Sequence, residues 1–236
     1  MPIEPDARLA SAVSDYRWLL DHGYPDQGSI KLVGDRYRLT GTERGILYRG
    51  VFSGSDSARR AARLVGSDDT GAVPLVRELT VDGHNVLFTL WNCLAGRPVV
   101  LATDGFVRDV GGTRARLPHD ERFARLATLL CRELAVLPLR SVTILLDEPL
   151  PWSRDHVSVI ERTWRDVSAD RAPDLSAVTE QSVDAVVART LRGGIATSDT
   201  AIIDRCSAPV LDLGGRIVRR AMRVRPIDMA ELADCR

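Results

Sequence analysis

Aspartate residues stand at or just past the ends of five predicted strands in this sequence. Each strand is a short apolar run, and the aspartate follows it within a few residues. In an open parallel sheet, ligands bind at the carboxyl ends of the strands, where such side chains meet. Carboxylates at one edge repel each other unless a cation lies between them, and Mg²⁺ and Mn²⁺ suit oxygen ligands. The five residues are Asp82, Asp104, Asp147, Asp199 and Asp212.

A divalent cation held by such carboxylates can activate water and stabilise the transition state of phosphoryl transfer. We therefore predict a catalytic Mg²⁺ or Mn²⁺ site whose ligands are Asp82, Asp104, Asp147 and Asp199. The competing interpretation of any single aspartate is structural, because an aspartate after a strand commonly caps the next helix. Asp199 in particular is a candidate N-cap for a helix that begins at Thr200.

Four further side chains are candidates for binding substrate. Asn85 follows Asp82 by three residues, so its amide can turn back over the end of the strand. Ser198 precedes Asp199, and Arg108 lies in the loop after the second strand, where it can meet a phosphate or an acidic neighbour. Trp152 lies in a loop with two prolines after the third strand, where it can stack on a base or close over the core.

The elements that must position these residues alternate between strands and helices after residue 75. Parallel strands need long crossovers, which helices supply, so the alternation predicts an α/β domain with a mostly parallel sheet flanked by helices. Strands are expected at residues 75–81, 98–102, 141–146, 175–179, 195–197 and 209–211. Helices are expected at residues 84–94, 121–137, 155–167 and 183–191.

The first 66 residues have helical periodicity and predict a small helical N-terminal domain. Thr40 and Glu43 form a capping-box pattern, which marks the start of one helix. Residues 67–74 are polar and flanked by glycine, so we interpret them as a linker. The predicted domains are therefore residues 1–66, the linker 67–74, and the α/β domain 75–236. Arginines between Arg36 and Arg63 would give the helical domain a basic face, although arginine on a helix surface is often only solvated.

Composition sets limits on the class of protein. The 236 residues are 44% hydrophobic and 27% charged, with 32 basic and 32 acidic side chains, so net charge favours neither nucleic acid nor a membrane. The four cysteines form no Cys-x-x-Cys pair, which argues against a zinc site and a disulfide framework. No apolar run approaches the ~20 residues that span a bilayer. These features predict a cytoplasmic protein without a membrane partner. Walker and dinucleotide-binding motifs are absent from the sequence.

The sequence resembles a prokaryotic family known as domain of unknown function 434 (DUF434). The similar segments in the helical part are residues 15–25 and 32–37. Those in the α/β part are 81–87, 104–109, 145–147 and 196–199. The resemblance implies a helical N-terminal segment followed by an α/β region.

A second resemblance is to the NYN branch of PIN-like ribonucleases, a Rossmann-like fold. It is carried by the segment from Asp82 to Asn85 and by Thr197, Ser198 and Asp199. It implies that Asp82 is the first metal ligand, with Asn85 beside it, and that Ser198 and Asp199 form the late element of the metal site. The late Ser-x-Asp-x-Asp spacing of those nucleases is shortened here, so one late acid is missing.

These features predict a metal-dependent PIN-like hydrolase, most simply a ribonuclease that cleaves phosphodiester bonds with metal-activated water. RNA is the expected partner, and the oligomeric state, a homodimer included, is open. Two alternatives remain. The shortened late motif favours a non-catalytic nucleic-acid-binding module on a degenerate nuclease fold. The same acidic edge would also suit a phosphatase or nucleotide-processing enzyme with a small substrate.

Overall fold

The structure is a computed structural model, and it describes residues 6–66, 76–111, 116–168 and 172–234. The chain forms two compact units, each built from separate segments. Unit 1 comprises residues 1–62, 92–114 and 224–236, and unit 2 comprises residues 63–91 and 115–223. Within the described part of the chain, no helix is both long enough and apolar enough to cross a membrane.

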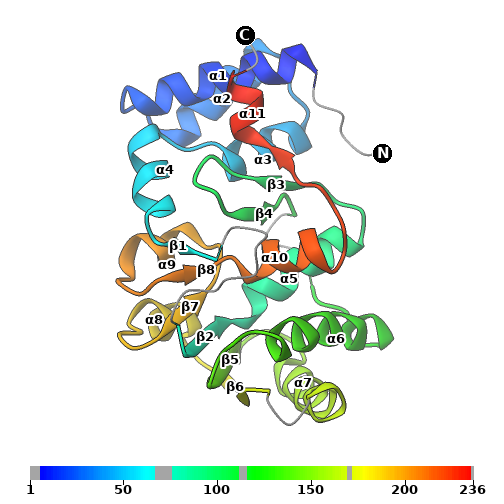
Figure 1. Cartoon of the computed structure of the whole chain (residues 1–236). Helices are drawn as coiled ribbons and strands as arrows, with labels where there is room; N and C mark the ends of the chain where they lie inside the picture. The colour runs from blue at the N-terminus through cyan, green and yellow to red at the C-terminus, as the bar shows by residue number, and fades with distance from the viewer. Residues whose placement is uncertain (1–5, 67–75, 112–115, 169–171, 235–236) are drawn as a thin grey trace. The chain divides into compact units, whose positions relative to one another are not determined.

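Unit 1 combines helices with a small sheet (Figure 1). Local sequence explains where its helices begin: the Asp6 side chain accepts a hydrogen bond from the Leu9 N–H, and Thr40 and Glu43 form the predicted capping box. The elements are α1 (Ala7–Asp21), α2 (Asp26–Arg36), α3 (Gly41–Gly50), α4 (Gly54–Ala61), β3 (Val99–Leu101), β4 (Val107–Asp109), β9 (Ile227–Asp228) and α11 (Met229–Asp234).

The apolar core of unit 1 draws on all three of its segments. Tyr16 and Leu47 are almost fully buried in one cluster with Val100 of β3 and Met229 of α11. In the small sheet, β3 pairs antiparallel with β4 and parallel with β9. The helices of the first segment therefore pack on strands that come from the middle and the end of the chain.

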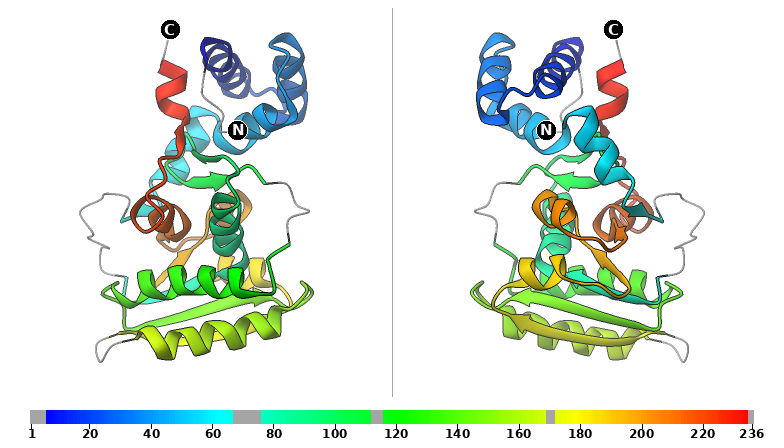
Figure 2. Two further views of the ribbon diagram at one scale, coloured as in Figure 1. Left: turned by 90° about the vertical axis from the view of Figure 1, so that its right-hand side faces the viewer. Right: turned by 90° about the vertical axis from the view of Figure 1, so that its left-hand side faces the viewer.

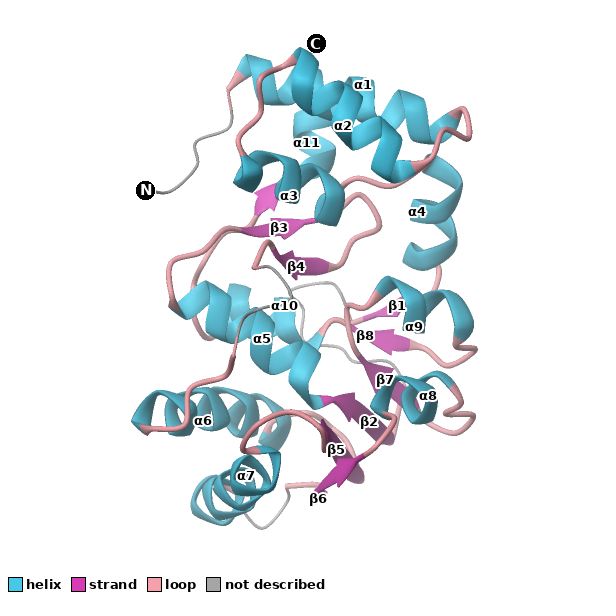
Figure 3. Ribbon diagram, turned by 180° about the vertical axis from the view of Figure 1, so that it is seen from behind, coloured by secondary structure: helices cyan, strands magenta, loops and turns pink. Residues whose placement is uncertain are grey.

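Unit 2 contains a six-stranded, fully parallel sheet flanked by helices, as the sequence predicted. The strands follow one another in the order β1-β8-β7-β2-β5-β6 (Figure 3). The strands are β1 (Leu64–Val65), β2 (Glu78–Asp82), β5 (Ser141–Asp147), β6 (Asp174–Glu180), β7 (Gly194–Ala196) and β8 (Val210–Leu211). The helices are α5 (Gly83–Leu94), whose last residues belong to unit 1, α6 (Glu121–Ala135), α7 (Ser153–Val167), α8 (Val183–Ala188), α9 (Thr200–Arg205) and α10 (Leu213–Arg220).

The strand order of this sheet reverses direction at β2. Along the chain, the path goes outward from β2 to β5 and β6, then returns to the other side of β2 and continues through β7 and β8. Ligands of open α/β sheets bind at such a switch point, outside the carboxyl ends of the strands. The topology therefore places the favoured site between the ends of β2 and β7.

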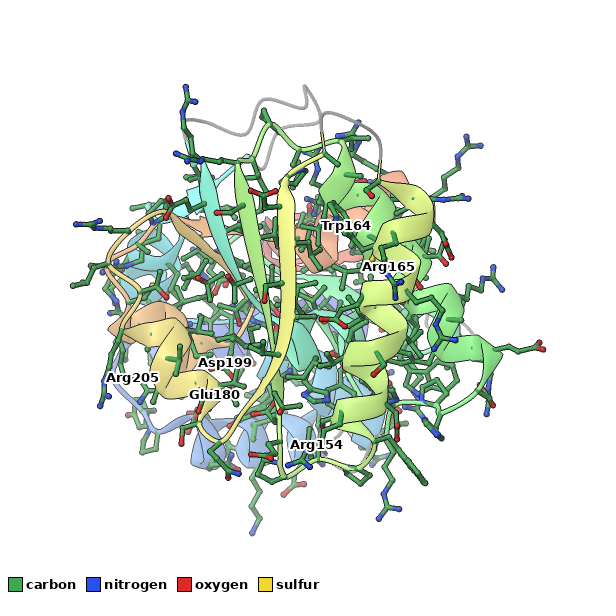
Figure 4. The ribbon with its side chains drawn as sticks, turned by 90° about the horizontal axis from the view of Figure 1, so that it is seen from below. Arg154, Trp164, Arg165, Glu180, Asp199 and Arg205 are labelled. Carbon is green, nitrogen blue, oxygen red and sulfur yellow. The ribbon has the colours of Figure 1, made fainter. Side chains whose placement is uncertain are left out.

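Helices cover both faces of the sheet. Helices α6 and α7 pack side by side, and α7 also packs on β5 and β6 (Figure 2). Helix α8 packs on β2 and β5 and also contacts α9. Figure 4 shows α7 and α8 on opposite sides of β6. The central strands are consequently buried on both faces, which explains the continuous apolar runs of β5 and β7.

The predicted strand at residues 98–102 exists as β3, but it was wrongly assigned to the parallel sheet. It belongs to the three-stranded sheet of unit 1, because its partners are β4 and β9. The predicted domains differ from the observed units for the same reason: residues 92–114 and 224–236 join the N-terminal helices. The predicted linker, residues 67–74, lies outside the described residues.

Candidate functional site

Asp82 ends β2 at the switch point of the sheet, and its side chain is only 4% exposed. Its Oδ2 accepts a 2.8 Å hydrogen bond from the Thr197 hydroxyl, and its Oδ1 accepts one of 3.3 Å from the Asn85 N–H. Thr197 follows β7, which pairs in parallel with β2 with Val81 opposite Ala196. The first candidate carboxylate is therefore held between the ends of two neighbouring strands.

The environment of Asp82 disfavours its negative charge. Burial raises the pKa of Asp82 to about 7; the hydrogen bonds from Thr197 and Asn85 oppose this rise, and the carboxylates of Asp147 and Asp184 add to it. Its two hydrogen-bonding partners are a hydroxyl and a backbone N–H, which are both neutral. A proton or a cation at the strand ends would therefore stabilise the Asp82 side chain.

Asn85 and Ser198 form the second link between β2 and β7. The Asn85 amide oxygen accepts hydrogen bonds from the Ser198 N–H at 2.8 Å and from the Ser198 hydroxyl at 3.1 Å. The sequence predicted that the Asn85 side chain would turn toward Asp82 or a phosphate. Instead its backbone N–H binds Asp82, and its amide oxygen fixes the segment after β7.

Asp147 ends β5 beside the buried ring of His84. The Asp147 N–H donates to His84 Nδ1 at 2.9 Å, and Asp147 Oδ2 lies 3.0 Å from the same nitrogen. A ring nitrogen that accepts from the backbone cannot also donate to the carboxylate, so Nδ1 serves one of these partners at a time. His84 was not among the predicted site residues, because its partner lies 63 residues away and no local pattern marks it.

Asp199 caps α9, in agreement with the structural interpretation of this residue. Its Oδ1 accepts hydrogen bonds from the Ala201 N–H at 2.7 Å and the Ile202 N–H at 3.1 Å. Both bonds end on the same oxygen, so the cap does not by itself exclude a ligand role for Oδ2. The Asp199 N–H donates to the Thr197 hydroxyl, which in turn donates to Asp82.

Asp184 is a fourth carboxylate of the site that the sequence analysis missed. It lies in the first turn of α8, and burial raises its pKa, with Asp199 and Asp147 adding to the rise and Arg205 opposing it. Because Asp184 also acts on Asp82, four carboxylates interact electrostatically: Asp82, Asp147, Asp184 and Asp199. Its place four residues after β6 was the available signal.

The structure does not place Asp104 or Arg108 with this cluster. Both belong to unit 1, where Arg108 binds Asp104 through two hydrogen bonds of 2.7 and 2.9 Å in a fully buried pair. Asp104 was expected at the edge of the parallel sheet because residues 98–102 were assigned to it. Asp212 caps α10 through a hydrogen bond from the Gly215 N–H.

Trp152 is exposed at the start of α7 rather than buried over the core. Its indole is 54% exposed and stacks on His119, with ring centroids 4.1 Å apart and an angle of 9° between the planes. Trp152 lies in unit 2, five residues after Asp147 in the loop that follows β5. The structure therefore leaves this side chain available for contact with a ligand.

The donor set of the cluster suits a hard cation, but a preformed cage is not seen. Four carboxylates supply the oxygen ligands that Mg²⁺ and Mn²⁺ prefer. Among the described residues, no three or more His, Cys, Asp and Glu side chains are arranged as a ligand group for a metal ion. Mg²⁺ commonly uses one or two protein carboxylates together with water and substrate phosphate. A cation that arrives with such a substrate would need only one or two of these carboxylates.

The fold and the site together describe a doubly wound α/β protein with acidic side chains at its switch point. The model of the family described as "Domain of unknown function (DUF5616)" matches residues 76–216, and the chain belongs to this family. The model described as "Protein of unknown function (DUF434)" matches residues 8–63. The predicted resemblance to DUF434 is thus confirmed for the N-terminal helices, whereas the α/β part matches a different family model.

One relative is the "Uncharacterized protein MJ0935" of Methanocaldococcus jannaschii. It is 23% identical to this chain over 137 residues, which are 58% of this chain and 64% of the relative. This chain therefore spans less than two thirds of the length of that protein. No solved structure matches the chain.

Proposed function

We propose that this protein is a metal-dependent hydrolase of the PIN-like kind that cleaves phosphodiester bonds in RNA. The observation that carries the proposal is the buried Asp82 at the switch point, whose charge is opposed by Asp147 and Asp184. A buried carboxylate with acidic neighbours at this position of an α/β sheet is explained best by a cation that binds with an anionic substrate. The resemblance of the Asp82–Asn85 and Ser198–Asp199 segments to NYN nucleases is a second support for the proposal.

Mg²⁺ or Mn²⁺ would be held by Asp82 and Asp147, with Asp184 and Asp199 as the neighbouring carboxylates. When bound, such a cation neutralises phosphate charge and lowers the pKa of a water molecule. The residues of the chain orient the site: the Thr197 hydroxyl and the Asn85 N–H each fix one oxygen of Asp82. His84 holds the backbone of Asp147.

We assign substrate-binding roles to Asn85, Ser198 and Trp152, but we assign no role in the site to Asp104 and Arg108. These two residues bind each other in unit 1. A cytoplasmic location is also part of the proposal. Cys93, Cys131 and Cys206 are buried free thiols, which suits a reducing compartment.

The test is cleavage of a labelled RNA with Mn²⁺ by the wild type and by Asp82→Asn. We expect the substitution to reduce the rate by about 100-fold or more, because a metal ion contributes several kcal/mol to such reactions. The matched control is Asp174→Asn, which removes an exposed carboxylate at the opposite end of β6 and should leave the rate unchanged. Equal rates for wild type and Asp82→Asn would remove the proposed role of Asp82.

A non-catalytic RNA-binding module is the second candidate. It is favoured by the structural use of the carboxylates, since both oxygens of Asp82 accept hydrogen bonds and Asp199 caps α9. This candidate predicts salt-dependent RNA binding without cleavage under any divalent ion. Adding mononucleotides and phosphate esters to the same cleavage assay tests the third prediction, an enzyme with a small substrate.

A further inference from the structure

The Trp152 ring is the exposed end of a row of four neighbouring rings in unit 2, which form two stacked pairs tilted by 56° to each other. His119 covers one face of the indole at a centroid distance of 4.1 Å. His119 lies 5.9 Å from His156, which stacks on Phe123 at 3.7 Å. His156 and Phe123 are almost fully buried, whereas the indole is 54% exposed. His119 therefore covers one face of an exposed indole, and the buried rings of His156 and Phe123 lie behind His119.

The backbone fixes the position of this ring. Trp152 has a φ of +69°, in the left-handed region that bulky side chains rarely adopt and that persists only where the surroundings impose it. The hydroxyl of its neighbour Ser153 has one proton to donate and lies 2.6 Å from the carbonyl oxygen of Asp147 and 2.9 Å from that of Leu150. The Trp152 carbonyl accepts the His156 N–H at 2.8 Å. The loop is thus tied to Asp147, a carboxylate of the acidic site.

A pocket of about 550 Å³ adjoins the ring, a volume typical of small-molecule sites. Trp152, Pro149 and Leu150 supply apolar lining, and Glu148, Arg154 and Gln181 supply polar groups. Arg154 donates a hydrogen bond to Oε1 of Glu148, and Gln181 donates one to Oε2. Figure 4 shows Arg154 at the same end of the sheet as Glu180 and Asp199, whereas Trp164 and Arg165 lie toward the other end of α7.

We propose that this pocket binds one unstacked nucleobase of a single-stranded RNA, with the base lying on the free face of Trp152. An aromatic platform bordered by hydrogen-bond donors and acceptors is how proteins hold splayed bases. The proposal rests on the proposed function in one respect: Ser153, next to Trp152, donates to the backbone carbonyl of Asp147, whose side chain is a proposed ligand of the cation that would act on a phosphate. It adds that the substrate must be locally unpaired.

The experiment measures binding of a fluorescein-labelled six-nucleotide RNA by anisotropy. All proteins carry Asp82→Asn so that cleavage does not interfere. Trp152→Ala should weaken binding about 5- to 100-fold, the loss expected when one stacked base is released. Trp152→Phe keeps an aromatic face and should bind more tightly than the Ala variant. Thermal unfolding of each variant confirms that the fold is retained.

The chain offers a matched control in Trp18. This residue is 52% exposed and stacks on a histidine, His22, at a centroid distance of 3.9 Å, but it lies in unit 1. Trp18→Ala removes a comparable exposed indole and should leave RNA affinity unchanged. A second arm uses six-nucleotide RNAs that each carry one abasic position. The RNA that lacks the stacked base should bind the protein with Trp152 as weakly as the intact RNA binds Trp152→Ala.

Several results would overturn the base pocket. These are no measurable RNA binding, equal affinity of the Ala and Phe variants, equal loss in Trp18→Ala, or equal binding of every abasic RNA and the intact RNA. Failure of the proposed hydrolysis has a different signature. In that case the Asp82-containing protein does not cleave RNA, while the affinities still depend on Trp152.

Discussion

Asp82 and Asp104 are two buried aspartates, each followed by a glycine, that have opposite surroundings. Each lies at or just past the end of a strand, each precedes a glycine, and neither side chain is more than 4% exposed. Asp104 in unit 1 receives two hydrogen bonds from Arg108 and has Arg60 at 3.7 Å. Asp82 in unit 2 receives hydrogen bonds from a hydroxyl and a backbone N–H, and its other electrostatic neighbours are carboxylates.

The comparison shows that the groups around a buried carboxylate determine whether it is structural or available to a ligand. A buried ion pair with two hydrogen bonds satisfies both charges and leaves nothing for a ligand to neutralise. A buried carboxylate among neutral and acidic groups has a negative charge that no nearby cation compensates, so it favours binding a proton or a cation. The Asp-Gly pair is identical in the two places, so the difference comes from residues far away in the sequence.

The largest expected effect is on protein stability when the buried ion pair of Asp104 and Arg108 is broken. Arg108→Met should destabilise the protein by about 3–5 kcal/mol, because it removes both hydrogen bonds of the buried ion pair and leaves Asp104 with the more distant Arg60. Urea denaturation of the purified variant measures the loss. Replacing both partners, as in Asp104→Leu with Arg108→Met, should recover part of this stability. A loss within about 0.5 kcal/mol for the single variant would mean that the pair is structurally unimportant.

The next effect concerns Asp82 and pH. Its pKa of about 7 in the folded protein lies above the ordinary value of 3.8, so the folded state binds the proton more tightly than the unfolded chain. The stability that protonation supplies is present near pH 4 and is lost as the pH rises toward 7 and beyond. Asp82→Asn should remove this dependence and stabilise the metal-free protein by about 2–4 kcal/mol at pH 8.

Urea denaturation of wild type and Asp82→Asn between pH 4 and pH 8 tests this prediction. The two proteins should differ little near pH 4 and most at pH 8. If the free energies of unfolding of the two proteins depended on pH in the same way over the whole range, the pKa of Asp82 would not be raised in the folded protein. Asp174→Asn serves as the control, because its carboxylate is exposed and should follow the wild type.

The smallest effect is stabilisation by a divalent cation. At a concentration ten times its dissociation constant, Mn²⁺ should stabilise the wild type by about 1.4 kcal/mol at pH 8, by mass action. Asp82→Asn should gain less, whereas Asp174→Asn should gain as much as the wild type. Thermal unfolding with Mn²⁺ and with EDTA makes the comparison. Equal gains in wild type and Asp82→Asn would place the cation elsewhere.

Much of the fold could be predicted from local patterns. The predicted parallel sheet with flanking helices is confirmed, as is the capping box of Thr40 and Glu43. The partner of a strand could not be predicted, because β3 is a short apolar run like those of the parallel sheet. Its assignment depends on pairing with β9, whose residues lie more than 120 positions later.

The site shows the same division between local and distant information. The ends of β2, β5 and β7 could be found from strands followed by acids, and the charge of Asp147 adds to the rise in the pKa of Asp82. Asp184 was missed because it lies within the first turn of a helix, where an acidic residue is ordinary. Thr197 and His84 were missed as positioning groups because their partners are 115 and 63 residues away.

The three-segment construction of unit 1 has a consequence for how this protein can be divided. A cut near residue 66 would follow the break between the two family matches, yet it would strand β3, β4 and β9 without the helices that share their core. Val100 and Met229 would then face water in any fragment that begins at the α/β region. The two family models match separate stretches of sequence, but the segments of the two units alternate along the chain, so neither unit can be exchanged by a single crossover in the gene.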